Sequence, residues 1–512
     1  MRPSRHTPRP AIGAKTLAAS KTFDVLETTI ADIHVAYRSG ALSARRLVQT
    51  YLDRIDAYDQ KGPAINALIS LNPHALEEAE KLDAALKDSG LAGPLHGIPV
   101  IIKDQADVKE MPTTLGSVLF EDHRPGRDAF VVAKLKEAGA IFLGKATLGE
   151  MGAGDTHGSL FGSTRNVYDL ERTAGGSSGG SAASVSANFC ALAVGQEGFA
   201  SIRRPAIWNG VAGMRPTAGL VSRTGVFAGW PSTAGSLGPM ARSVADLAVL
   251  LDAMVGYDPD DPLTAHGVGH GPASYADSLA AGALAGARIG ILREPMARNS
   301  EPGSDDFDMI GQVFDKAVDD LGALGAEIVD PIIIPDVAAL LAKRADNPEV
   351  GERAFQVYLA GSANAPYGSL AELLASPKFA QASQHTRDRF ARLKPPGAHY
   401  DSLKARETLM TRMLQVMADH RLDAIVHKAV EHQPTLISDG INPPYVSAKG
   451  APHINTFLVF VPSIVVPAGF TADNLPAGIT FLGRPYDDAN MIRFAYAYEQ
   501  ATHHRRAPSS TP

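Results

Sequence analysis

The chain has 512 residues, of which 45% are hydrophobic and 20% are charged, with a formal net charge of -7. This composition is typical of a globular protein with room for one large α/β domain or two smaller ones. The negative charge, without any basic block, argues against a nucleic-acid partner. The single cysteine, Cys190, excludes an internal disulfide framework and a thiolate zinc site, and its apolar neighbours predict a small buried side chain.

No stretch of the sequence is apolar for long enough to span a membrane, and the longest apolar run, residues 457–470, contains two prolines. Residues 1–22 are basic and lack the continuous apolar segment of a secretory signal. We interpret them as a disordered tail that precedes one domain over residues 23–512. The predicted compartment is the cytoplasm, and an exported form whose leader is lost or degraded is the alternative.

Helices are predicted to open the fold. The first covers about residues 29–38, the second begins after the N-cap residue Ser43, and a third follows Pro73. The run Gly97 to Lys103 is apolar up to its last residue, which is typical of a strand buried on both faces. Another helix and strand are predicted next, at residues 130–137 and 140–144.

A strand–helix–strand unit is predicted in the second half of the chain. Residues 288–292 and 326–330 are the strands, and apolar residues at helical spacing lie between them. Residues 337–418 are polar, helical in pattern and interrupted by prolines, so we interpret them as a helical insertion over one side of the sheet. The sheet is predicted to resume at residues 422–426 and 462–466. Alternating strands and helices predict an α/β fold with a mostly parallel or mixed sheet covered by helices.

The most informative feature is the sequence Gly-Gly-Ser-Ser-Gly-Gly-Ser at residues 175–181, which a second serine, Ser201, follows. Glycine loses more conformational freedom on folding than any other residue. Four glycines around three hydroxyls therefore predict unusual backbone angles or a close approach to another group. An apolar stretch follows at once, which argues against a flexible linker.

Three interpretations of this loop are open from the residues alone. A phosphate cradle is disfavoured because no Gly-Lys-Ser/Thr follows. A nucleophile elbow matches G-x-S-x-G, but it requires a strand before it, and residues 169–174 are polar. Its candidate histidines are His427, His432 and His453. The third interpretation is a relay, in which a serine lies between a lysine base and a separate nucleophile.

Lys103 and Ser201 are the candidates for that base and that nucleophile. Lys103 ends an apolar strand, where burial lowers the pKa of an amine and makes it a base near neutral pH. The alternative is a lysine that reaches solvent at the strand end. Ser201 lies in a turn after a predicted strand end at residues 192–195, and the alternative is a turn serine that bonds to its own backbone.

These residues together resemble the amidase signature family, which includes fatty acid amide hydrolase and the A subunit of glutamyl-tRNA amidotransferase. The family motifs Gly-Ile-Pro…Lys-Asp, Gly-Gly-Ser-Ser-Gly-Gly and Gly-Ser-Ile-Arg-x-Pro correspond to residues 97–104, 175–180 and 200–205. The two serines are 24 residues apart, as the family pattern requires. Further similar blocks extend the resemblance over about residues 28–502; they are 144–150, 161–166, 210–217, 238–243, 466–470 and 475–478.

The resemblance implies an amidase signature fold, which is an α/β fold with a large mixed central sheet, helices on both sides and a helical insertion at residues 337–418. It also implies a Ser-cis-Ser-Lys triad. Ser201 would be the nucleophile, Ser177 the relay on a cis peptide bond with Gly176, and Lys103 the base, neutral in the resting enzyme.

The resemblance further implies an oxyanion hole made by the backbone N–H groups of Gly198, Phe199 and Ala200, with Ser201 itself. Ser178 and Gly176 would support the triad, and the alternative for Ser178 is an ordinary loop hydroxyl. Arg203 is expected to hold the structure together by pairing with carbonyls or a carboxylate.

One segment departs from the family pattern. The family has Asp-x-Gly-Gly-Ser, whereas this chain has Glu197-Gly-Phe-Ala-Ser201. If these positions need positive φ, Phe199 and Ala200 would be strained. We expect an adjusted but working oxyanion hole or a shifted substrate preference, with a crippled enzyme as the third outcome. Phe199, Trp208 and Trp230 are candidate pocket residues and favour apolar or aryl acyl groups; core packing is the alternative.

The leading prediction is a serine amidohydrolase that cleaves the C–N bond of a small linear amide, anilide or carbamate through an acyl-enzyme. One alternative is a glutaminase-type subunit that supplies ammonia to a partner, and another is a family member that binds amides without catalysis. The predicted partners are a small-molecule amide and water, with a homodimer left open. No cofactor is predicted, because the sequence contains no metal-ligand cluster.

Overall fold

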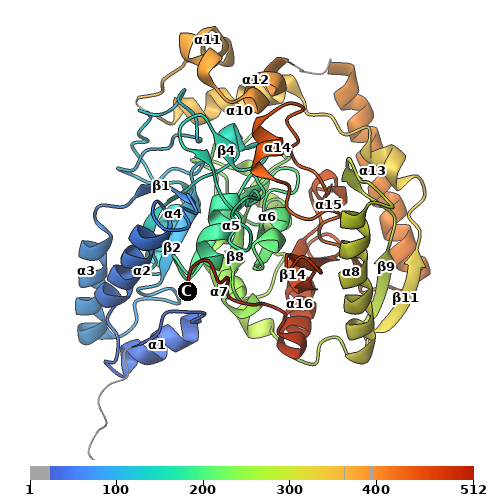
Figure 1. Ribbon diagram of the computed structural model, residues 1–512, viewed down its shortest axis with the longest axis horizontal. Coiled ribbons are helices and arrows are strands. Elements are labelled where there is room, and N and C mark those ends of the chain that lie inside the picture. The colour runs from blue at the N-terminus through green and yellow to red at the C-terminus, as the bar shows by residue number, and fades with distance from the viewer. Residues whose placement is uncertain (1–22, 363, 392–395) are drawn as a thin grey trace, which may run out of the picture.

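The structure is a computed structural model that describes residues 23–362, 364–391 and 396–512, so the predicted tail at 1–22 lies outside the described residues (Figure 1). An eleven-stranded sheet runs through the molecule in the order β1-β3-β2-β6-β8-β7-β14-β15-β12-β9-β11. Its strands, in chain order, are β1 Leu68–Leu71, β2 Pro99–Lys103, β3 Ile141–Ala146, β6 Leu192–Glu197, β7 Ala212–Arg215, β8 Ser236–Ala241, β9 Arg288–Leu292, β11 Glu327–Ile332, β12 Ala424–Lys428, β14 Ser463–Phe470 and β15 Pro476–Leu482.

The sheet is mixed. Two parallel blocks, β3-β2-β6 and β12-β9-β11, flank an antiparallel centre that contains β8, β7, β14 and β15. Parallel neighbours need a crossover connection, and helices supply it in both blocks. Two short ribbons lie outside the sheet; they are β4 His157–Gly158 with β5 Gly162–Ser163, and β10 Ala297–Arg298 with β13 Ala451–Pro452.

Helices cover both faces of the sheet, which confirms the predicted fold class (Figure 1). Their bounds are α1 Ile30–Arg38, α2 Ala44–Tyr58, α3 Ala75–Ser89, α4 Phe130–Glu137, α5 Gly179–Ser186, α6 Arg203–Trp208, α7 Val244–Met254, α8 Asp305–Ala323, α9 Val337–Leu341, α10 Pro348–Ala360, α11 Leu370–Ala375, α12 Gln384–Ala391, α13 Pro396–Asp419, α14 Ile437–Ile441, α15 Ile454–Phe457 and α16 Asp488–Thr502. Short 3₁₀ turns occupy residues 150–152, 262–267, 276–278 and 377–381.

Local signals explain where the first helices begin. Thr29 and Asp32 form a capping box at the start of α1, in which each side chain accepts from the other residue's backbone N–H. Ser43 caps α2 as predicted, because its hydroxyl accepts from the N–H of Arg46. The predicted helix at residues 130–137 is α4, and the predicted strand–helix–strand unit is β9, α8 and β11.

The central strands β7, β8 and β15 were not predicted, because each contains glycine or proline, which are depleted in strands. The structure gives a packing reason for three strand glycines. A Cβ at Gly195, Gly213 or Gly238 would lie within 3.1 Å of the Ile202 side chain. Ile202, the residue after Ser201, is therefore buried in space that the glycines leave open.

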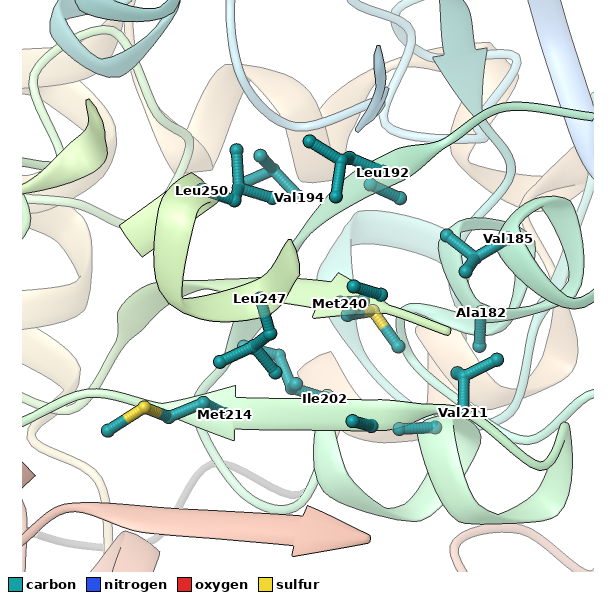
Figure 2. Close-up of a cluster of buried hydrophobic side chains, with 14 of the residues drawn as sticks. Ala182, Val185, Leu192, Val194, Ile202, Val211, Met214, Met240, Leu247 and Leu250 are labelled. Carbon is teal, nitrogen blue, oxygen red and sulfur yellow. The ribbon is translucent and has the colours of Figure 1, made fainter. Parts of the chain in front are cut away.

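The core around this point contains apolar side chains from α5, β6, β7, β8 and α7, and Figure 2 shows Ile202 among them, with Val185, Val194 and Met240. The turn that carries Ser201 is thus fixed to the centre of the sheet. Cys190 is fully buried in the same core, where burial raises the pKa of its thiol to about 12, as expected for a structural side chain.

Residues 337–418 contain α9 to α13, as the sequence pattern predicted. Phe355, Tyr358 and Leu359 of α10 pack in one cluster with Phe120 and Phe227 from the main body. The Tyr358 hydroxyl also donates to Asp107 Oδ1 at 2.9 Å. This helical region, at the top and right of Figure 1, is therefore joined to the loop that follows β2. Among the described residues, no helix is long and apolar enough to cross a membrane.

Candidate active site

Lys103 is the last residue of β2 and its side chain is completely buried. Its Nζ donates to Ser177 Oγ at 2.7 Å and to the Gln196 carbonyl at 3.2 Å. Burial lowers the pKa of Lys103 well below the usual lysine value, and the Glu197 carboxylate opposes this shift only in part. The alternative of a lysine that reaches solvent is therefore wrong, and the structure provides the buried amine that a neutral base requires.

The glycine-serine loop has the special backbone that its composition predicted. Gly175 has a φ of 80°, and a Cβ there would lie 2.8 Å from the Trp208 ring. The peptide bond between Gly176 and Ser177 is cis, as the resemblance implied. The Ser177 hydroxyl donates to the Gly152 carbonyl at 2.9 Å and accepts from Lys103. The loop thus presents one buried hydroxyl to the lysine.

Ser178 joins the two serine segments. Its N–H donates to the Ser201 carbonyl at 3.1 Å, and its hydroxyl donates to the Gln196 carbonyl at 3.1 Å. The same carbonyl also accepts from Lys103. Ser178 therefore bonds directly to Ser201 and shares one carbonyl acceptor with Lys103.

Ser201 lies in the turn between β6 and α6. It is 8% exposed, whereas Lys103 and Ser177 are each 0% exposed, so Ser201 is the member of the three that solvent can reach. Within the described part of the chain, its hydroxyl and the backbone N–H groups of residues 199–201 make no hydrogen bond. A hydroxyl without a hydrogen-bond partner and N–H groups without acceptors therefore lie together in one turn.

Glu197, at the end of β6, holds this turn. Its Oε2 accepts from the N–H groups of Ile202 at 2.9 Å and Arg203 at 3.1 Å, and its Oε1 accepts from Arg203 Nε at 2.8 Å. Burial alone would raise the pKa of Glu197, but Arg203, Arg215 and the two N–H groups lower it below its usual value. The carboxylate is therefore charged, and Arg203 has the structural role predicted for it.

The departure from the family pattern causes no backbone strain. Neither Phe199 nor Ala200 has a positive φ, so the condition under which they would be strained is not met. The Phe199 ring instead stacks on His453 with centroids 4.8 Å apart. The guanidinium groups of Arg344 and Arg298 lie 5.2 and 5.9 Å from its centroid.

The two tryptophans have different surroundings. Trp208 has no exposed surface, and its Nε1 donates to the His432 carbonyl at 3.0 Å. The Arg204 guanidinium lies 4.7 Å from its ring and donates to the Gly176 carbonyl at 3.1 Å. Trp230 is partly buried against a separate apolar cluster. Trp208 thus touches the loop of Gly175 and the Arg204 guanidinium, and the assignment of Trp230 to the substrate pocket stays a prediction.

The nucleophile-elbow interpretation lacks its structural context. Residues 169–174 form no strand, and only isolated bridges occur there. His427 bonds through Nδ1 to the Lys428 carbonyl, and burial lowers its pKa to about 3. His432 pairs with Asp306 at 2.6 Å, and His453 stacks on Phe199.

Several site residues escaped the sequence analysis. The sequence analysis treated Glu197 only as part of the segment that departs from the family pattern. An acidic residue at the end of an apolar strand, just before the candidate nucleophile, could have indicated its role in holding the turn. Asp104 pairs with Lys145 at 3.0 Å, both fully buried, directly beside Lys103. The arginines around Phe199 come from distant segments, and no local pattern joins them.

Comparisons with known proteins identify the family of this chain. The Amidase family model matches residues 46–492. A probable amidase of Arabidopsis thaliana is 32% identical over 97% of this chain and 94% of its own length. The A subunit of glutamyl-tRNA(Gln) amidotransferase from Heliobacterium modesticaldum is 32% identical over 93% of this chain and 96% of its own.

The fold has a close counterpart among solved structures. The native peptide amidase from Stenotrophomonas maltophilia superimposes with a TM-score of 0.80 at 33% identity, over 95% of this chain and 99% of that one. The chain therefore belongs to the amidase family, in which the sequence resemblance had placed it. It is a hydrolase that acts on amides.

Proposed function

We propose that this protein is a serine amidohydrolase that uses Lys103, Ser177 and Ser201 as a catalytic triad to cleave small linear amides, anilides or carbamates. One observation carries the proposal: a fully buried lysine donates to the Ser177 hydroxyl at 2.7 Å. The hydrogen bond between Ser178 N–H and the Ser201 carbonyl places Ser201, the third residue of the proposed triad, beside the loop that contains Ser177.

The first step is attack of Ser201 Oγ on the amide carbonyl carbon. Its proton passes to Ser177 Oγ while the Ser177 proton passes to Lys103 Nζ, which becomes an ammonium group. For this transfer, the Ser177 proton turns from the Gly152 carbonyl to the lysine lone pair, so Lys103 must begin neutral. The structure contains no hydrogen bond between Ser201 and Ser177, and substrate binding must bring these hydroxyls together.

The second step breaks the C–N bond. Lys103 returns its proton through Ser177 to the leaving nitrogen, the amine departs, and the acyl group remains as an ester on Ser201. Water then attacks this ester by the same relay and releases the acid. The backbone N–H groups of Gly198, Phe199 and Ala200, with that of Ser201, are the proposed donors to the carbonyl oxyanion, and losing one such donor typically costs about 10²–10³ in rate.

A labelling and turnover experiment tests the triad. Wild-type protein should release amine from an anilide in a burst and should react with a fluorophosphonate at one serine. Ser201→Ala should lose both, whereas Ser186→Ala, a buried helix serine outside the site, should keep both. Unchanged turnover in Ser201→Ala would exclude the mechanism, and a folded wild type without turnover or labelling would favour the non-catalytic alternative.

The relatives support a second candidate, a glutaminase subunit, because A subunits of glutamyl-tRNA(Gln) amidotransferases match over almost the whole chain. The two candidates differ in their dependence on a partner. The isolated chain should hydrolyse anilides at full rate if it is a stand-alone amidohydrolase. Hydrolysis of glutamine alone, and only with an added partner, would select the second candidate.

A further inference from the structure

Three arginines from distant segments meet beside the candidate nucleophile. Arg298 is on β10, Arg344 follows α9, and Arg389 is on α12. The helices that carry or precede the last two belong to the region at the top and right of Figure 1. The charges of Arg344 and Asp346 both act on Arg389, which puts these side chains in one neighbourhood.

Two of the arginines bond to the loops on either side of the candidate triad. Arg344 donates to the Gly198 carbonyl at 3.1 Å, next to the proposed oxyanion hole. Arg389 donates to the Met151 carbonyl at 3.1 Å, and the next residue, Gly152, accepts from the Ser177 hydroxyl. One guanidinium group therefore lies against the turn that carries Ser201, and the other lies against the segment that accepts from Ser177.

Phe199 contacts two of the three arginines. Arg344 and Arg298 both lie over its ring, at 5.2 and 5.9 Å from the centroid. Such contacts stabilise a cation over an aromatic face. A glycine at position 199, as in the family pattern, would provide no such platform. The substitution of Phe for Gly thus has a structural consequence in this chain.

One carboxylate, that of Asp346, acts on two of the three arginines. Arg344 has Asp346 at 3.5 Å, but the Asp346 side chain is 77% exposed, so this pair is weak. Across the described ranges, Arg298 and Arg389 form no ion pair with a carboxylate, and both are exposed to solvent. The cluster is therefore a local positive site in a protein whose formal net charge is -7.

We propose that Arg298, Arg344 and Arg389 form an anion subsite beside Ser201, and that the preferred substrate is an amide that carries a carboxylate. This inference rests on the proposed amidohydrolase function and names its substrate class. Arginine suits this task because its planar donors match both oxygens of a carboxylate. The positive field also concentrates anionic substrates near the nucleophile.

Matched anilides test the proposal. N-succinyl-4-nitroanilide carries a carboxylate, and N-pentanoyl-4-nitroanilide is its neutral counterpart; 4-acetamidobenzoate and acetanilide place the charge on the amine side. We expect kcat/KM to favour the anionic member of at least one pair by roughly tenfold or more, as hydrogen bonds to charged groups allow. Higher salt should raise KM for that member selectively, because ions screen exposed charges.

Substitutions test which arginines form the anion subsite. Arg298→Gln and Arg389→Gln should each lower the anionic-to-neutral ratio of kcat/KM by roughly three- to tenfold, through KM rather than kcat. Arg46→Gln, on the exposed face of α2, is the control and should keep the wild-type ratio. Equal ratios in wild type and both site variants would overturn the subsite.

Failure of the subsite and failure of the proposed function give different results. If both members of each pair are cleaved equally, the amidohydrolase stands and the subsite is wrong. If neither member is cleaved, the affinity of both anilides for Ser201→Ala is measured by calorimetry. The subsite predicts that N-succinyl-4-nitroanilide binds this variant more tightly than its neutral counterpart does. Equal or weaker binding of the anion would overturn it.

Discussion

Replacing Glu197 by glutamine is the sharpest perturbation of the turn that carries Ser201. The substitution keeps the size of the side chain but removes its charge and turns one acceptor oxygen into an N–H donor. In the structure, both oxygens accept hydrogen bonds, from Ile202 N–H, Arg203 N–H and Arg203 Nε. An amide must therefore place its NH₂ group against a donor, whichever way it is turned.

The expected cost follows from burial. Glu197 and Arg203 are both 0% exposed, and Arg215 lies 3.9 Å from the same carboxylate. Removing one partner of a buried ion pair typically costs about 3–5 kcal/mol, because it leaves an uncompensated charge. We expect the free energy of unfolding of Glu197→Gln to fall by this amount. A displaced nucleophile should also lower kcat, by up to about 10²-fold for a shift of about 1 Å.

Urea denaturation measures the loss of stability in Glu197→Gln. A pH series of kcat/KM measures the change in the Lys103 pKa. The Glu197 charge raises the pKa of Lys103 against the larger effect of burial. Its removal should lower that pKa further and move the acid limb of the pH profile to lower pH. Glu327→Gln is the matched control: Glu327 pairs with Arg288 at 2.7 Å, but its side chain is 63% exposed, so at most about 1 kcal/mol is expected.

Two results would refute this reasoning. One is a loss of stability in Glu197→Gln no larger than in Glu327→Gln, which would mean that the buried carboxylate is not required. The other is an acid limb that stays in place, which would mean that the Glu197 charge does not act on Lys103.

Three further predictions concern the same site. In the wild type, kcat/KM should rise with pH through the Lys103 pKa, because only the neutral amine accepts a proton; this limb should lie below the usual lysine range, and a limb near the ordinary lysine pKa would contradict the buried base. Asp104→Asn should destabilise the protein by about 3–5 kcal/mol in urea denaturation, since it leaves Lys145 buried without its counterion; a change under about 1 kcal/mol would show that the pair is dispensable. Phe199→Gly should lower the free energy of unfolding by about 1–2 kcal/mol through loss of the ring stack on His453 and greater backbone freedom, and unchanged thermal denaturation would argue against this packing.

The sequence predicted much of the fold because its local signals were strong. Ser43 marked the start of α2, and the apolar run that ends at Lys103 marked a buried strand, β2. The strands β7, β8 and β15 had no such signal. The glycines of β7 and β8 are explained by packing against a residue outside both strands, because a Cβ at Gly213 or Gly238 would crowd the Ile202 side chain.

The candidate triad could be predicted from the sequence because each of its three residues lies in a short motif that is recognisable by itself. A strand end, a glycine-rich loop and a turn before a helix can each be recognised over a few residues, and their combination pointed to one family. The sequence also determined that the loop around Ser177 must have unusual backbone geometry, since only glycine accepts a φ of 80° such as that of Gly175 at little cost.

Only the tertiary structure decided which side chains meet. The contact between Lys103 and Ser177 spans 74 residues, and it depends on the sheet that places β2 beside β6. Arg298 and Arg344 both reach the Phe199 ring because β10 and the helical region fold against the main body. Such contacts depend on packing between distant segments, and packing leaves no periodic pattern in the chain.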